Sequence, residues 1–266
     1  MSLRIIVCVK QVPEPEYYSR LKLDPNKFTL IREGVPSITN PCDRNALEEA
    51  LRIREKYSGE VIALSMGPPQ AFDTLDEALA MGADKAVLLC DSALAGGDTL
   101  ATAYALCYGM RKLGDYDLIL CGNESADGAT GQVGPQVAEF LGIPHITRAT
   151  SIEFVSERSV RVKSAIEYGY LQIDLQLPAV ITVSKDINAC RLPTVKGILE
   201  VASKETHKWD CKQLEADLTK LGLQGSPTQV IGVTKQETER RKEILQGTPE
   251  EMAHKAVQRL HELGAI

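Results

Sequence analysis

The glycine-rich motif DGATGQVGP holds the residues whose types and spacing are best suited to binding chemistry. Its evenly spaced glycines are Gly128, Gly131 and Gly134, and Thr130 and Gln132 lie between them. A glycine-rich stretch in front of a helical pattern can leave backbone N–H groups facing an anion. The motif is neither a GxGxxG dinucleotide fingerprint nor a GxxxxGK phosphate loop, because no Lys follows its last glycine. We therefore expect an anion site of another type.

Metal chemistry and side-chain catalysis have little support elsewhere in the chain. The seven cysteines are odd in number and form no CxxC pair, which argues against a zinc or iron–sulfur site and against a disulfide framework. The four histidines, His145, His207, His254 and His261, lack the spacing of a metal-binding pair. No GxSxG motif or Cys–His arrangement stands out. We expect no metal and no catalytic residue, which favours a carrier or binding protein.

The composition excludes further classes. The 266 residues are 44% hydrophobic and 25% charged, as in a soluble globular protein with one large domain, with or without an extension. A net charge of −6 argues against a nucleic-acid partner. No apolar run approaches the ~20 residues of a membrane span, and the start of the chain lacks the pattern of a signal peptide. We expect a cytoplasmic protein without membrane insertion.

Short apolar runs alternate with helical patterns over the first half of the chain. Runs typical of strands buried on both faces lie at 4–10, 60–66, 86–89 and 117–121. Helical spacing follows Asp43, a good N-cap, and recurs at 72–81, 99–113 and 132–141. This alternation predicts an open, mainly parallel sheet with helices on both faces.

Other elements are also expected. A small hairpin around a DPN turn is expected at 21–31, and the second half of the chain predicts an antiparallel edge meander at 151–155, 159–166 and 168–175 and a buried strand at 179–183. From 204 onward the chain is polar and loosely patterned, and ends in a helix that starts at Pro249 with Thr248 as its cap. We therefore divide the chain into an α/β nucleotide-binding domain, 1–203, and a C-terminal extension, 204–266. From the pattern alone, the extension either packs on a partner subunit or folds back on its own domain.

Small and polar residues gather where the expected parallel strands end, at the sheet edge where ligands bind. A flat ring has room over Ser65, Met66 and Gly67, and an anion can bind the hydroxyls of Thr99 or Thr102 and the glycine-rich motif. Together these turns predict an adenine-nucleotide site. Each turn taken singly is better explained as an ordinary strand–helix connection, and only the turns taken together favour the nucleotide site.

Six segments, in order and over nearly the whole chain, resemble the β-subunit of electron transfer flavoproteins. They are VKQVPEP, NPCDRNALEEAL, ALSMGPPQA, EALAMGADKAVLL, DLILCGNESADGATGQVGPQVAEFLGIP and LPAVITVSKDINACRLPTVKGI. The resemblance implies an adenine-nucleotide-hydrolase-like fold and an α-subunit that carries FAD. It also implies AMP in the β-subunit of simple carriers, or a second FAD reduced by NADH in the electron-bifurcating branch. The glycine-rich motif is similar to that branch's DGDTAQVGP, from which Ala129 and Gly131 depart.

By position, the resemblance implies a set of nucleotide contacts. They are Cys8, Val9, Asn40, Ser65, Met66, Gly67, Thr99, Thr102, Cys121, Gly122, Gly128, Thr130, Gly131, Gln132 and Val133. It also implies a dehydrogenase-recognition segment made of Arg191, Leu192, Pro193, Thr194 and Val195, and a C-terminal extension that packs on the α-subunit.

Three hypotheses follow. In the first, the chain binds FAD and takes electrons from NADH, one of which goes to ferredoxin and the other through the α-subunit FAD to a flavin-dependent dehydrogenase. In the second, the chain is a simple carrier subunit that holds structural AMP. The third is a stand-alone protein that binds or hydrolyses an adenine nucleotide.

Overall fold

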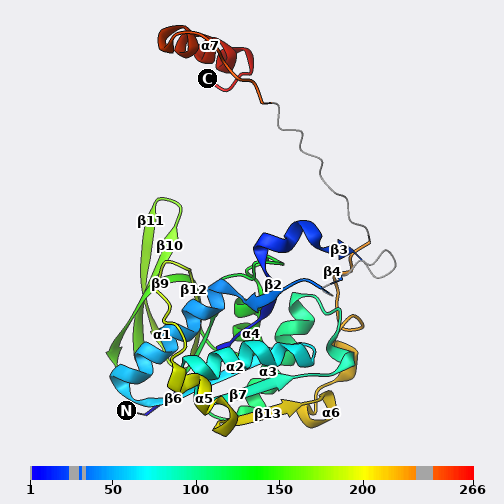
Figure 1. The fold of residues 1–266 in the computed structure, drawn as a ribbon. Coiled ribbons are helices and arrows are strands. Elements are labelled where there is room, and N and C mark those ends of the chain that lie inside the picture. Colours follow the sequence, from blue (N-terminus) through cyan, green and yellow to red (C-terminus); the bar gives the residue numbers. More distant parts are fainter. Residues whose placement is uncertain (1, 24–29, 32–33, 232–241) are drawn as a thin grey trace. The chain divides into compact units, whose positions relative to one another are not determined.

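The computed structural model describes residues 2–23, 30–31, 34–231 and 242–266, in two compact units (Figure 1). The larger unit is Met1–Ile231 and the smaller is Gly232–Ile266. The larger unit contains the sheet, and the smaller contains the helix α7 (Pro249–Glu262). No helix in the described ranges has the length and apolar character that a bilayer crossing needs.

A nine-stranded sheet forms the centre of the larger unit, in the order β11-β10-β9-β12-β8-β1-β6-β7-β13. All neighbours from β9 to β13 in this order run parallel, and only β9–β10 and β10–β11 pair antiparallel. The parallel strands are β1 (Leu3–Cys8), β6 (Gly59–Met66), β7 (Lys85–Leu89), β8 (Leu118–Gly122), β12 (Ala179–Val183) and β13 (Glu205–Trp209). The edge meander is β9 (His145–Ser156), β10 (Ser159–Ile166) and β11 (Gly169–Gln176).

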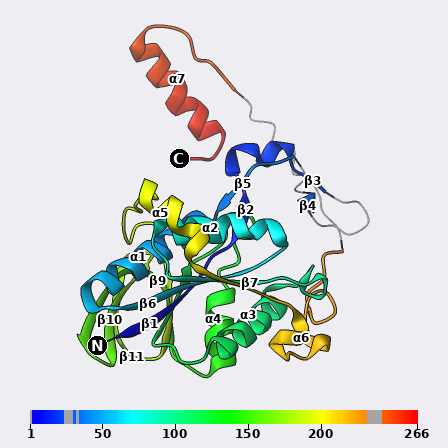
Figure 2. The same cartoon turned by 60° about the horizontal axis from the view of Figure 1, so that its bottom comes forward.

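Helices cover both faces of the sheet (Figure 2). On one face α1 (Pro41–Tyr57) and α2 (Phe72–Met81) share a buried core with Ile5 and Val7 of β1. On the other face α3 (Thr99–Leu113) and α4 (Val133–Leu141) pack in a second core with Ile6 of β1. The alternation of β1 residues between the two cores is that of a strand buried on both sides. The expected α/β architecture is confirmed.

Local signals account for the ends of two helices. The predictions of 72–81 and 99–113 match α2 and α3 at both ends. Gly82, at φ 131°, adopts a conformation open to glycine and ends α2. The Asp98 carboxylate accepts hydrogen bonds from the N–H groups of Leu100 and Ala101, both 3.0 Å long, and so caps α3.

Two small antiparallel pairs lie in the connection between β1 and α1. One pairs β2 (Gln11–Pro13) with β5 (Ser37–Thr39), and the other pairs β3 (Lys22–Leu23) with β4 (Leu30–Ile31). The second pair is the predicted hairpin. Its DPN turn lies outside the described residues.

The start of α1 corrects one prediction. Asp43 is not the N-cap, because Asn40 occupies that position and Pro41 is the first helical residue. Asp43 lies in the first turn and is buried. Its carboxylate binds backbone groups of neighbouring strands instead of the helix it belongs to.

The chain after 203 corrects the predicted domain boundary. Residues Glu205–Trp209 form β13 and pair along their length with β7 in the main sheet. Beyond β13, Leu221 and the two end residues of the short helix α6 (Cys211–Leu214) are buried in the core of the α3 face. The larger unit therefore runs to Ile231. The polar alternation of β13 concealed it, because an edge strand needs few apolar side chains.

The predicted last helix is present as α7. Thr248 caps it through a capping box with Glu251, and Pro249 is its first residue. A further short helix, α5 (Val195–Glu200), was not predicted and begins at the cap residue Thr194. It packs near α2, on the same side of the sheet.

Candidate functional site

A cleft of about 720 Å³ opens at the carboxyl ends of the parallel strands. Cys8 and Val9 at the end of β1, and Cys121 and Gly122 at the end of β8, line it. The chain leaves β1 toward β6 and later returns to the other side of β1 as β8, so the cleft lies where the strand order reverses. Its volume is within the range of about 300–1,000 Å³ that is typical of ligand and cofactor sites.

The floor of the cleft is apolar and faces α3 and α4. Leu64 of β6, Ile119 of β8 and Val180 of β12 line it, together with Leu106 and Val137 of the helices. All five side chains also belong to the core of that face. The floor is therefore a closed apolar layer, against which a flat ring can pack.

The loop that follows β8 carries the glycine-rich motif along the polar wall. Ala129 and Gly131 have left-handed φ values of 47° and 63°. Within the described part of the chain, no hydrogen bond uses the backbone N–H groups of Thr130, Gly131 or Gln132. These groups line the cleft ahead of the N-terminus of α4 and are available to an anion.

Asn40 and Lys10 fix this loop from the neighbouring elements. The Asn40 side-chain amide donates to the Glu124 carbonyl at 2.9 Å, and its oxygen accepts from the Ala126 N–H at 3.0 Å. Lys10 Nζ lies 2.6 Å from Asp127 Oδ1. The first part of the loop, residues 124–127, is therefore anchored ahead of the glycines.

Asp43 joins the ends of β1 and β8 under the cleft. Its two carboxylate oxygens accept the backbone N–H groups of Lys10 and Gly122, each at 2.9 Å. A Cβ at Gly122 would lie 2.4 Å from Asp43 Oδ1, so only glycine fits. Burial raises the pKa of Asp43 to about 7, against hydrogen bonds from Asn40, Gly122 and Lys10 that lower it.

The opposite wall is the entrance to α3, where a segment from the C-terminal part of the chain also contributes. Thr99 Oγ1 donates to Gln132 Oε1 at 3.0 Å and links the two walls. The Asp98 carboxylate accepts the Thr228 N–H at 3.0 Å, and its own N–H donates to Ser226 Oγ at 2.8 Å. Thr228 and Val230 thereby reach the rim of the cleft.

The two cysteines of the cleft are neutral thiols. Cys8 and Cys121 follow the paired residues Val7 and Leu120 on neighbouring strands. Burial raises the pKa of Cys121 to about 12, and burial together with the Cys121 thiol raises that of Cys8. Neither is a nucleophile, since the thiolate is the reactive form. The described residues also contain no cluster of ligands suited to a metal ion.

Comparison with known proteins adds the family. The model of the electron transfer flavoprotein domain matches residues 27–214. The chain belongs to the electron transfer flavoprotein family. It is 46% identical to an electron transfer flavoprotein subunit beta of Thermoanaerobacterium thermosaccharolyticum, over 97% of this chain and 98% of the relative. It is 44% identical to the caffeyl-CoA reductase-Etf complex subunit CarD of Acetobacterium woodii over 86% of each chain, and 41% identical to protein FixA of Azorhizobium caulinodans over 85% and 82%.

These relatives make the chain a β-subunit with a role in electron transfer, which implies an α-subunit as its partner. The structure brings together fourteen of the fifteen residues expected at the flavoprotein nucleotide site, since all of them except Ser65 line the cleft. Leu64 and Met66 line it, and strand alternation turns Ser65 toward the α1 and α2 face, where it is 1% exposed.

Sequence reasoning missed several residues of the cleft. They are Lys10, Asp43, Asn123, Ser125, Asp98, Thr228 and Val230. Lys10 and Asn123 directly follow residues of the expected set, so the ends of the strands were a usable signal. Thr228 and Val230 had none, because tertiary contacts with Asp98 place them there.

The expected partner segment divides in two. Arg191 turns inward and binds Glu48 of α1, and Thr194 caps α5 by accepting the Gly197 N–H at 3.0 Å. Leu192 and Val195 are 77% and 76% exposed, and Ile198 and Leu199 are also exposed. We call these four residues the α5 surface. Pro193 is half-buried beside it.

Proposed function

We propose that this β-subunit binds FAD in the cleft, accepts electrons from NADH and distributes them between two acceptors. One electron goes to a low-potential acceptor such as ferredoxin. The other goes through an FAD of the α-subunit to a flavin-dependent dehydrogenase. The similarity to a subunit of a reductase-Etf complex and to FixA proteins supports a role in a larger electron-transfer assembly.

The volume of the cleft, and its combination of an apolar floor with a polar wall, are the main support for FAD as the ligand. About 720 Å³ is more than an adenosine monophosphate needs, and the site combines an apolar floor with a polar wall. The N–H groups of Thr130, Gly131 and Gln132 would hold the diphosphate. The hydroxyl of Thr102 would contribute a further donor, and that of Thr99, which donates to Gln132, would accept or exchange partners.

The protein supplies binding and electrostatics, and the cofactor supplies the redox chemistry. When bound, the flavin ring accepts a hydride from NADH and passes electrons on singly. The thiols of Cys8 and Cys121 are neutral and add no charge at the ends of β1 and β8. Lys10, which is paired with Asp127, is a charged group of the cleft wall.

The smaller unit is proposed to pack on the α-subunit. Its helix α7 exposes Val257, Leu260 and Leu263 at helical spacing, and Met252 is only half-exposed. An apolar stripe of this kind gains stability by burial against a partner. Docking of the dehydrogenase is proposed for the α5 surface, whose four apolar side chains are largely exposed.

The number of flavins decides between this function and that of a simple carrier. The heterodimer with its α-subunit is purified and unfolded, and the released nucleotides are separated and quantified. Two FAD per heterodimer, bleached by NADH without oxygen, is the expected result. One FAD and one AMP, without bleaching by NADH, would replace the proposal with the simple carrier. A chain that forms no heterodimer and hydrolyses ATP would refute both.

The docking role has its own test. Leu192→Ala with Val195→Ala should weaken coupling to the dehydrogenase about thirtyfold, since truncation of an interface anchor costs on the order of 2 kcal/mol. The flavin content and reduction by NADH should stay unchanged. An unaltered dehydrogenase KM in the double variant would remove the α5 surface from the proposal.

A further inference from the structure

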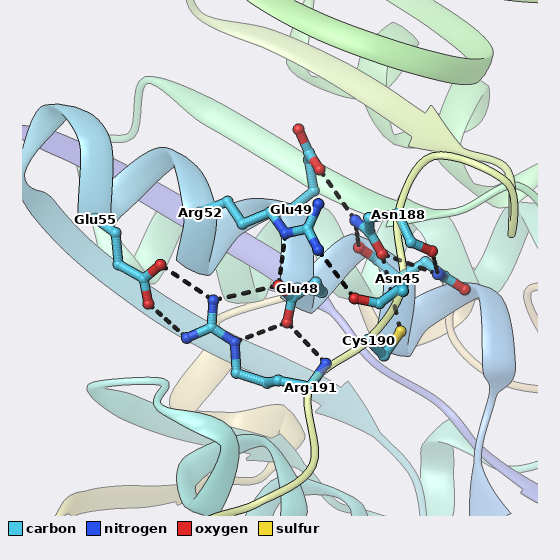
Figure 3. A network of polar contacts seen from close by, with 9 residues as sticks. Asn45, Glu48, Glu49, Arg52, Glu55, Asn188, Cys190 and Arg191 are labelled. Atoms are coloured by element: carbon cyan, nitrogen blue, oxygen red, sulfur yellow. Dashed lines mark hydrogen bonds and ion pairs between the residues drawn. The ribbon is translucent and has the colours of Figure 1, made fainter.

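A polar network joins α1 to the segment that leads into the α5 surface (Figure 3). Side chains of α1 bind three backbone groups of this segment. Asn45 donates to the Asn188 carbonyl at 3.0 Å, Arg52 donates to the Ala189 carbonyl at 3.0 Å, and Glu48 accepts the Arg191 N–H at 3.1 Å. The segment is thereby fixed along about two turns of α1, immediately before Leu192.

Glu48 is the centre of the network. Its side chain is 3% exposed, and its carboxylate accepts Nε of Arg191 at 2.7 Å and Nε of Arg52 at 2.6 Å. The other end of the Arg191 guanidinium binds Glu55 (Figure 3). Burial raises the pKa of Glu48, but hydrogen bonds from Arg191 and Arg52 outweigh it and hold that pKa below its usual value. The carboxylate is therefore a buried charge that is fully compensated.

A second contact holds α5 from the side of α2. A Cβ at Gly197 would lie 2.2 Å from the Ala80 carbonyl oxygen, so the α5 backbone lies directly against the C-terminal part of α2. Arg191 therefore holds the segment that precedes α5, and the close contact at Gly197 holds the middle of the α5 helix. Neither contact involves the four exposed side chains of the α5 surface.

The physical need for such fixing is clear from the size of α5. A helix of six residues is unstable by itself, and exposed apolar side chains contribute nothing to its stability in the free protein. A binding surface that is already ordered avoids the entropy cost of ordering on association. Directional, charge-assisted hydrogen bonds to a buried carboxylate provide that order without covering the apolar side chains.

We infer that Glu48 and Arg191 are positioning residues for partner docking, which hold the α5 surface in its binding conformation before the dehydrogenase arrives. This inference rests on the docking role proposed above for that surface. Nothing in it requires either residue to touch the dehydrogenase.

Arg191→Lys tests the inference, because Lys keeps the charge and loses the two-sided fork. The matched control is Arg161→Lys on β10, where a guanidinium also binds a carboxylate through two nitrogens, at 2.8 and 2.9 Å from Asp174. Hydrogen exchange is measured on both heterodimers. In Arg191→Lys the amides of 192–200 should exchange about tenfold faster, with the sheet unchanged, and the control should match the wild type. Unchanged exchange at 192–200, or an equal rise throughout the larger unit, would overturn the inference.

A double-mutant cycle separates positioning from direct contact. The probe is an acyl-CoA dehydrogenase that the wild-type heterodimer reduces, and its KM for the heterodimer is measured. Arg191→Lys should raise the KM about tenfold in the wild type and have little effect when Leu192 and Val195 are already Ala. An equal effect in both backgrounds would mean direct contact and refute positioning. If Leu192→Ala with Val195→Ala leaves the KM unaltered, the proposed docking role of the α5 surface is itself refuted. Faster exchange without any rise in KM would also refute the inference.

Discussion

Replacement of Gly131 by Val should weaken nucleotide binding through the backbone. Gly131 has φ 63°, and the nearest atom to an added Cβ is the Asn123 carbonyl oxygen at 3.6 Å, an ordinary contact. Crowding is therefore not the cause of the effect. The left-handed conformation costs an L-residue about 1–2 kcal/mol, and a β-branched side chain lies at the upper end or beyond.

The loop can relieve this strain in the free protein, because its residues from 128 to 130 are exposed. A nucleotide that needs the N–H groups in their present orientation must then restore the strained conformation. A cost of 1–2 kcal/mol corresponds to a roughly 5- to 30-fold loss of affinity. Gly131→Ala should fall at the low end, since the similar motif DGDTAQVGP has Ala at this position.

Gly142→Val is the matched control. Gly142 has φ 68° at the end of α4, with no atom within 4 Å of an added Cβ, and it does not line the cleft. The Gly142→Val protein should lose about as much thermal stability as Gly131→Val, but it should bind FAD with the affinity of the wild type. FAD affinity is measured on the heterodimer stripped of nucleotide, by the change in flavin fluorescence on binding. Equal affinity in Gly131→Val and Gly142→Val would refute the assignment of this loop as the phosphate site.

Two further predictions concern the stability of the larger unit. The folded-state pKa of Asp43 is raised to about 7 from 3.8, so its contribution to stability is fully present below about pH 4 and is lost as the pH rises through 7. Asp43→Asn presents an amide N–H₂ to one of two backbone donors, which costs about 1–3 kcal/mol. The gap in unfolding free energy between wild type and Asp43→Asn should therefore narrow from pH 5 to 8.5 in denaturant titrations, and a gap that widens would contradict the raised pKa. A chain that ends at Ile231 should keep the stability of the larger unit. A chain that ends at Ser203 loses β13 and the buried Leu214 and Leu221, whose burial alone contributes about 3–6 kcal/mol. It should therefore melt at a lower temperature than the chain that ends at Ile231. Equal melting temperatures for the two chains would support the domain boundary first expected after residue 203.

The sequence predicted those elements whose signals are local. The helices Phe72–Met81 and Thr99–Leu113 have their stop and cap within a residue of the helical pattern, at Gly82 and Asp98. The strands buried on both faces could also be predicted, because each is a short apolar run. The strand Glu205–Trp209 was missed, because its place at the edge of the sheet depends on the pairing with β7 and not on its own composition.

The cleft residues show the same division between local and tertiary information. Strand ends and glycines were enough to predict the edge of the sheet, because parallel strands bring their carboxyl ends to one edge. The fourteen lining residues were named through the resemblance to the flavoprotein β-subunit. The sequence did not reveal that Ser65 faces away, which depends on which of two alternating faces borders α3 and α4. It also gave no indication that Thr228, far along the chain, is held at the rim by Asp98.

The sequence by itself therefore determined the fold class, the sheet edge that carries the site and the family to which the chain belongs. These follow from patterns repeated within a few residues, or over whole segments. Only the tertiary structure decided that Asp43 joins two strands, that Arg191 turns inward to Glu48, and that the α5 surface stays exposed. Each of these depends on groups more than thirty positions apart in the chain, such as Lys10 and Asp43 or Glu48 and Arg191. Burial and hydrogen bonding between such groups arise only once the sheet and its helices have assembled, so no local pattern encodes them.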